Sequence, residues 1–204
     1  MIAIIEYGLG NIGAFVNVYQ RLNIPVAVAK TADDLKAATK IILPGVGAFD
    51  RAINRLNNSG MRETLDKLVL DNKLPVIGIC AGMQMLAKSS EEGVLAGLGW
   101  IDGAVKRFDA SVLKSKTRLP HMGWNTIRPD NDNPLLLNLS NESRFYFLHS
   151  YYFQCNNPHD AIATTEYGIQ FASAVNSRNI YGVQFHPEKS HQWGIQLLKN
   201  FAEL

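Results

Sequence analysis

The feature that most constrains this chain is a series of short apolar runs that alternate with stretches of helical spacing. The runs that predict strands cover residues 2–7, 25–30, 40–44 and 75–80. The stretches that predict helices cover residues 11–22, 31–40, 49–56, 61–69 and 82–89. Strands that are apolar at nearly every position are typical of parallel sheets covered on both faces. The order therefore predicts right-handed crossovers and an α/β, doubly wound, mostly parallel sheet.

The second half of the chain differs in composition and in its pattern of apolar residues. After residue 92, glycine and proline become frequent, and strand-like segments cover residues 145–154, 161–165 and 180–185. Trp193, Leu197, Leu198 and Phe201 have helical spacing and predict a closing helix over residues 190–204. We expect an antiparallel C-terminal portion of the sheet. With 204 residues, 47% of them hydrophobic, the chain suits a single domain over residues 1–204.

Composition narrows the classes of function. A net charge of +2 without a basic run gives no electrostatic footprint for nucleic acid, and the apolar runs are far too short for a membrane span. The first residues are interpreted as a strand and not as a signal peptide, so we expect a cytoplasmic protein. Its two cysteines, Cys80 and Cys155, are then expected to be reduced.

A first glycine motif, Gly8-Leu9-Gly10-Asn11-Ile12-Gly13, matches the dinucleotide-binding fingerprint. That fingerprint also needs an acidic residue at the end of the second strand, where this chain has Ala29-Lys30. We therefore favour a glycine turn with Asn11 as helix N-cap and predict no cofactor. Saturable binding of NAD at this turn would revive the alternative.

A second motif places Cys80 on a sharp turn. In Gly78-Ile79-Cys80-Ala81-Gly82 the cysteine lies between two glycines, where a buried strand meets a helix. This is the nucleophile-elbow pattern with sulfur in place of oxygen, and the close backbone approach explains the glycines at 78 and 82. A helix N-terminus favours the thiolate. Cys155 lacks such surroundings and is interpreted as structural.

A nucleophilic cysteine needs a base, and Phe185-His186-Pro187-Glu188 offers one. Proline at 187 favours an extended His186, from which Glu188 can reach the imidazole. Such a carboxylate fixes the tautomer and stabilises the imidazolium. The other four histidines lack a carboxylate at this spacing. A glycine turn at residues 45–47 ends another buried strand, and its N–H groups are candidates to hold an oxyanion beside Cys80.

Together these motifs resemble the triad type of class I glutamine amidotransferases. The resemblance rests on Pro44-Gly45-Val46-Gly47, on Gly78-Ile79-Cys80-Ala81-Gly82-Met83-Gln84 and on His186-Pro187-Glu188, and it covers essentially the entire chain. Three further segments are similar to the glutaminase subunits of imidazole glycerol phosphate synthases. They are Pro120-His121-Met122-Gly123-Trp124-Asn125, Leu148-His149-Ser150-Tyr151-Tyr152 and Lys189-Ser190.

The resemblance implies a role for each matching residue. Cys80 attacks the carboxamide of L-glutamine, His186 shuttles the proton and Glu188 orients His186, with ammonia and glutamate as products and no metal. The substrate-binding residues implied are Val46, Gly47, Gln84, Ser150 and Tyr151. Ala81 stands where the family usually has leucine, which affects packing but removes no reactive group.

The resemblance also implies a partner, because nothing in the chain resembles a site for a phosphorylated acceptor. The expected partner is a cyclase subunit with a (β/α)8 barrel, in a heterodimer, that uses the ammonia to form imidazole glycerol phosphate. The residues implied at the docking face are Asn11, His121, Met122, Trp124 and Lys189. Two alternatives stay open: a paralogous amidotransferase that supplies a sugar-modifying synthetase in surface polysaccharide assembly, and a non-catalytic regulatory subunit.

Overall fold

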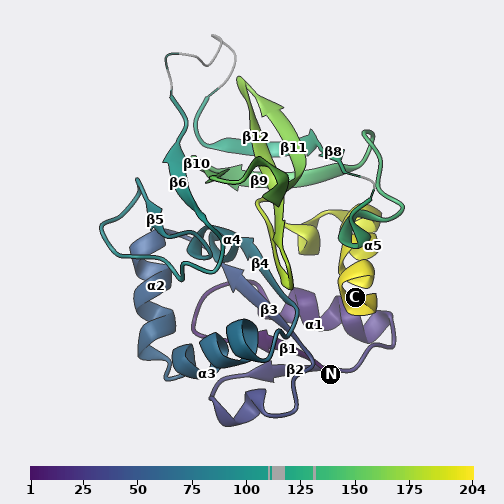
Figure 1. Cartoon of the computed structure of the whole chain (residues 1–204). Helices are drawn as coiled ribbons and strands as arrows, with labels where there is room; N and C mark the ends of the chain where they lie inside the picture. The colour runs from purple at the N-terminus through teal and green to yellow at the C-terminus, as the bar shows by residue number, and fades with distance from the viewer. Residues whose placement is uncertain (110, 112–117, 131) are drawn as a thin grey trace.

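The computed structural model describes residues 1–109, 111, 118–130 and 132–204, and one long mixed sheet runs through them (Figure 1). Its parallel part has the order β2-β1-β3-β4-β13. These strands are β1 (Ile2–Ile5), β2 (Val26–Ala29), β3 (Lys40–Gly45), β4 (Val76–Cys80) and β13 (Ile180–Val183). The predicted α/β fold with a doubly wound, mostly parallel sheet is confirmed for this half.

The sheet continues from β13 as an antiparallel portion, also as predicted. It contains β12 (Ile169–Ser177), β10 (Tyr151–Cys155), β6 (Gly103–Arg107), β11 (Ala161–Tyr167) and the short β8 (Arg128–Pro129), while β5 (Ser89–Ser90) pairs parallel with β6. A separate antiparallel ribbon pairs β7 (His121–Thr126) with β9 (Arg144–His149). Short turns of 3-10 helix lie at Asp33–Leu35, Pro134–Leu136, Pro158–Asp160 and Pro187–Lys189.

Helices cover both faces of the parallel strands because successive strand residues point to opposite sides. Ile41 joins the core under α2 (Phe49–Asn58) and α3 (Arg62–Asp66), while its neighbour Ile42 joins the core under α1 (Ile12–Arg21) and α5 (His191–Glu203). In Figure 1, α2 and α3 lie on one side of the strands, and α1 and α5 lie on the other. A π-helical turn, Lys67–Asp71, extends α3. None of the described helices is long and apolar enough to cross a membrane.

The short helix α4 (Ala81–Met85) follows β4 directly and packs unusually close to the strands. A Cβ atom on Gly82 would lie 2.0 Å from the Leu43 carbonyl oxygen, and one on Gly45 would lie 2.2 Å from the Gly82 nitrogen. Only glycine tolerates such an approach. As a result β3 and β4 end side by side, with Gly45 opposite Cys80 in the register.

The structure corrects three predicted elements. The helix predicted over residues 82–89 ends at Met85, and Ser89 belongs to β5. In place of a helix over residues 31–40, the chain forms only the 3-10 turn Asp33–Leu35, and Lys40 already begins β3. The Asp34 carboxylate accepts hydrogen bonds from the backbone N–H groups of Lys30 and Thr31 and so competes with a helix. Residues 145–154 are not one strand. The chain turns at Ser150, so that β9 belongs to the ribbon and β10 to the main sheet.

Candidate active site

Cys80 stands at the turn between β4 and α4 in a backbone conformation that is rare for a side-chain-bearing residue. Its φ is +55° and its ψ is −113°, and only 7% of the residue is exposed. Backbone strain of this kind persists where the surroundings enforce it, and it is characteristic of nucleophile elbows. The predicted need for glycine is met, because a Cβ on Gly78 would lie 2.6 Å from the Gly82 carbonyl oxygen.

His186 and Glu188 lie together, as their spacing predicts. The ring Nδ1 of His186 lies 2.9 Å from Oε1 of Glu188, and both side chains are almost fully buried. The His186 backbone N–H donates to the Tyr146 carbonyl at 2.9 Å, which fixes the histidine against β9. The other carboxylate oxygen of Glu188, Oε2, is buried and has no hydrogen-bond partner among the described residues. The hydrogen bond from His186 to Oε1 therefore offsets the cost of burying this carboxylate.

The charge state of His186 follows from its neighbours. Burial by itself lowers the pKa of His186, but the hydrogen bonds and charges of Cys80 and Glu188 outweigh it and raise the pKa to about 10. An imidazolium therefore faces Cys80 at neutral pH. This arrangement suits a proton donor to a leaving amine.

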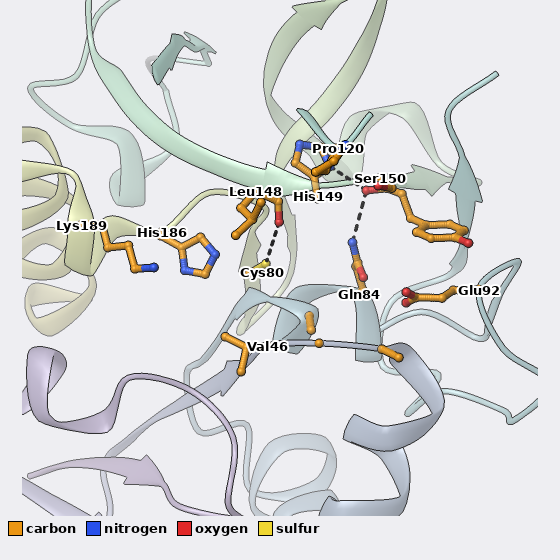
Figure 2. A pocket seen from close by; sticks show the side chains of 14 residues that line it. Val46, Cys80, Gln84, Glu92, Pro120, Leu148, His149, Ser150, His186 and Lys189 are labelled. Atoms are coloured by element: carbon orange, nitrogen blue, oxygen red, sulfur yellow. Dashed lines mark hydrogen bonds between the residues drawn. The ribbon is translucent and has the colours of Figure 1, made fainter. Parts of the chain in front are cut away.

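A cavity of about 410 Å³ opens above the sulfur atom (Figure 2). Cys80 and His186 line it, and so do all five predicted substrate-binding residues: Val46, Gly47, Gln84, Ser150 and Tyr151. Lys189 also reaches its wall. The structure thus brings together the elbow, the base and the glycine turn from segments far apart in the sequence.

Glutamine side chains connect the cavity wall to the sulfur. Nε2 of Gln84 donates to the Tyr151 carbonyl at 3.2 Å and to Oε1 of Gln184 at 3.0 Å. Nε2 of Gln184 in turn lies 3.8 Å from the Cys80 sulfur, and Gln184 is fully buried. Gln184 was not predicted from the sequence, although it stands two residues before His186.

Sequence reasoning also missed Glu92. Its side chain lines the cavity, and Oε2 accepts the Phe49 backbone N–H at 2.9 Å, at the N-terminus of α2. That N-terminus favours a carboxylate. Glu92 gives the cavity a negative end opposite the triad (Figure 2).

The first glycine motif packs against the active-site turn. Gly10 has a φ of +96°, and a Cβ there would lie 2.6 Å from Cβ of Pro44. The motif is therefore explained as a tight turn, as predicted. Asn11 is the N-cap residue of α1, as predicted, but its side chain makes no capping hydrogen bond.

Four of the five predicted docking residues are exposed. Asn11 and Lys189 are exposed, as are Met122 at 61% and Trp124 at 41%. His121 is not, because only 3% of it is exposed. Alternation along β7 turns Met122 and Trp124 outward and His121 inward, so we correct its predicted position on the surface. We call residues 121–126 and 144–149 the docking ribbon.

Within the parts of the chain that the structure describes, no group of three His, Cys, Asp or Glu side chains is placed to hold a metal ion. The second cysteine lies away from the cavity, in β10. Burial raises the pKa of Cys155 to about 12, aided by the nearby charge of Asp160. Its thiol is therefore protonated at neutral pH, unlike a working nucleophile.

Comparison with known proteins agrees with this geometry. The chain belongs to the class I glutamine amidotransferase family, whose model matches residues 3–204. It is 59% identical, over 100% of both chains, to the imidazole glycerol phosphate synthase subunit HisH of Bdellovibrio bacteriovorus. It is 52% identical to the protein of that name from Leptospira interrogans, again over 100% of both chains.

Solved structures share the fold at low sequence identity. One described as a glutamine amidotransferase is 18% identical, covers 100% of both chains and has a TM-score of 0.75. Another, PurLQS from Thermotoga maritima, is 16% identical, covers 99% of this chain and 97% of that chain, and has a TM-score of 0.73.

Proposed function

We propose that this chain is a glutaminase subunit of an imidazole glycerol phosphate synthase. It hydrolyses L-glutamine to glutamate and ammonia and passes the ammonia to a cyclase subunit in histidine biosynthesis, in the cytoplasm. The observation that carries the proposal is that Cys80 and His186 line one cavity, with the Glu188 carboxylate 2.9 Å from the His186 ring. Its full-length similarity to proteins named as this subunit supports the choice of pathway.

The chemistry follows from the placement of Cys80 beside His186. The Cys80 thiolate attacks the side-chain carbonyl carbon of glutamine, and the carbonyl electrons move onto oxygen. Collapse of this intermediate expels the amine, which takes the proton from His186 and leaves as ammonia. Water then attacks the γ-glutamyl thioester and gives a proton to His186, the sulfur leaves as thiolate, and glutamate is released with the imidazolium restored. Glu188 holds the ring so that Nε2 serves both steps.

The cavity offers complementary groups for an amino acid. Nε2 of Gln84 donates both of its protons to protein acceptors, so its Oε1 is left to accept a hydrogen bond from a ligand. With the Glu92 carboxylate, this oxygen suits the α-ammonium group of glutamine. Backbone groups of Val46, Gly47 and the Ser150–Tyr151 segment would hold the remaining polar atoms. N–H groups in the turn at residues 45–47 would stabilise the oxyanion.

The exposed residues near the cavity suit a protein partner. Met122, Trp124 and Leu148 expose apolar surface on the docking ribbon. The Lys189 ammonium lies over the Tyr146 ring of the ribbon, and Asn11 is also exposed. Exposed aromatic residues of this kind often dominate binding energy. Free ammonia becomes ammonium in neutral water and loses its nucleophilic lone pair. A cyclase barrel bound over the cavity would shield the ammonia on its way to the acceptor.

The proposal is tested with the chain and the cyclase subunit encoded in the same genome. We expect a 1:1 complex that makes imidazole glycerol phosphate from glutamine. The Cys80→Ala complex should lose glutamine-dependent turnover but keep turnover with ammonium salt. Failure to bind the cyclase would favour the paralogous amidotransferase, and a wild-type complex that releases no glutamate would favour a regulatory subunit. Either result contradicts the proposal.

A further inference from the structure

The docking ribbon has two chemically different faces. Met122 pairs across the strands with Leu148, and Trp124 pairs with Tyr146, on the outward face. His121 pairs with His149, and both face inward, 3% and 6% exposed. A buried pair of imidazoles directly behind an exposed apolar face is not required by packing, since two apolar side chains would fill the same space.

The inward pair forms a hydrogen-bonded chain with a fixed direction. The His149 ring Nδ1 lies 2.7 Å from the Tyr151 carbonyl, so it must carry the proton, and Nε2 is left as an acceptor. Nδ1 of His121 lies 2.9 Å from that Nε2 and donates to it. Nε2 of His121 then accepts from the Asn125 amide at 3.2 Å. Every ring nitrogen is satisfied only if both rings are neutral and protonated on Nδ1.

The surroundings keep both rings neutral. The His121 ring stacks on Tyr167, with ring centroids 3.9 Å apart, and on Phe147 at 4.7 Å. Burial lowers the pKa of His121 to about 4, and burial with the neighbouring His121 lowers the pKa of His149 to about 3. The chain of hydrogen bonds is therefore complete throughout the neutral range.

The hydrogen-bonded series that starts at Asn125 reaches the catalytic sulfur through the wall of the cavity. The Tyr151 carbonyl that accepts from His149 also accepts from Gln84, which bonds to Gln184, and Gln184 contacts the Cys80 sulfur. In Figure 2, Gln84 and His149 both point to the backbone next to Ser150. A continuous polar path thus leads from the docking ribbon to the nucleophile.

We infer that His121 and His149 are positioning residues that link the docking ribbon to the wall of the glutamine cavity. Movement of the ribbon on docking would then shift the Tyr151 carbonyl, and with it Gln84 and Gln184. The inference rests on the proposed function, because it assigns the pair a role in glutamine turnover by the complex. His149 lines the cavity beside the Ser150–Tyr151 segment, whereas His121 lies behind it, so the pair acts through the cavity wall.

Two substitutions at His121 separate positioning from packing. His121→Phe keeps a ring to stack on Tyr167 but removes both hydrogen bonds. His121→Asn loses the ring but places an amide N–H close to the position of Nδ1. In the cyclase complex we expect His121→Phe to lower kcat/KM for glutamine roughly 10-fold, since a buried acceptor loses its donor. His121→Asn should stay within about 3-fold of wild type.

Turnover with ammonium salt should be unchanged in both variants, because it bypasses the cavity. A packing role predicts the reverse order, with Phe tolerated and Asn damaging, and that order or equal effects would overturn the inference. If the wild-type complex has no glutaminase activity, the proposed function fails and this inference fails with it. An active wild type with a fully active His121→Phe variant overturns this inference alone.

A measurement on the free chain covers the case in which the variants fold poorly. Nitrogen-15 NMR of the wild-type histidine rings at pH 7 should show Nδ1 protonated and Nε2 unprotonated in both His121 and His149. Protonation of Nε2 in either ring would break the direction of the chain and overturn the inference.

Discussion

The buried histidine pair should make this protein sensitive to mild acid. In the folded state, burial holds the pKa of His121 at about 4 and that of His149 at about 3, whereas an unfolded histidine titrates near ~6.5. A lowered folded-state pKa contributes stability that is fully present above the unfolded value and is lost as the pH falls. The loss should therefore begin below about pH 6.5, before carboxylates titrate.

The magnitude follows from proton uptake. Each unfolded imidazole is about three-quarters protonated at pH 6 and almost fully protonated at pH 5, while the folded pair stays neutral. Each proton taken up on unfolding costs about 1.4 kcal/mol per pH unit, so two histidines give a loss of about 2 kcal/mol. His186 behaves oppositely. Its raised pKa, about 10, gives stability that is present below about pH 6.5 and lost as the pH rises, so it changes little in this window.

Urea unfolding at pH 6.0 and pH 5.0 measures this loss directly. The wild type should lose about 2 kcal/mol of unfolding free energy over that step, and His121→Asn, which cannot be protonated, should lose about half as much. The variant controls for all other titrating groups. If wild type and variant show the same loss, or if the wild type shows none, the buried neutral pair is not as described.

Three further predictions concern the site and its support. Glu188→Gln should reduce kcat for glutamine by about 10²–10⁴-fold. It should also move the alkaline limit of activity in a pH–rate profile to lower pH, because the Glu188 charge helps to raise the pKa of His186. Glu92→Gln should raise KM for glutamine about 10-fold with a smaller effect on kcat in steady-state assays, because it removes a charge that binds the substrate and not the reacting group. Gly82→Ala should lower the free energy of unfolding by about 3 kcal/mol, because the new Cβ would meet the Leu43 carbonyl oxygen. The control Gly13→Ala should stay within about 1 kcal/mol of wild type, because a Cβ at residue 13 has nothing within 4 Å.

Much of the site could be predicted from the sequence because neighbouring residues within short segments determine its geometry. The glycines around Cys80 encode the close packing of α4 on β3 and β4, and the proline after His186 favours the backbone from which Glu188 reaches the ring. The buried apolar runs predicted the parallel strands, and the carboxyl ends of such strands share one edge. The meeting of Cys80 with the turn at residues 45–47 followed from that topology.

The remaining features depend on contacts between distant segments. No local pattern pairs β7 with β9, so the inward position of His121 and its bond to His149 could not be foreseen. The helix predicted over residues 31–40 failed because the Asp34 side chain satisfies backbone N–H groups that a helix would have used. Glu92 reaches the cavity only because it contacts the start of α2, 43 residues away.

The role of Cys80 as nucleophile is tested by locating the reactive thiol. The chain is treated with an electrophilic glutamine analogue, with and without excess glutamine, and the modified peptide is identified by mass spectrometry. We expect Cys80 to be labelled and glutamine to block the labelling, with Cys155 as an unmodified internal control. Labelling of Cys155, or glutamine turnover by a chain whose Cys80 stays unmodified, would contradict it.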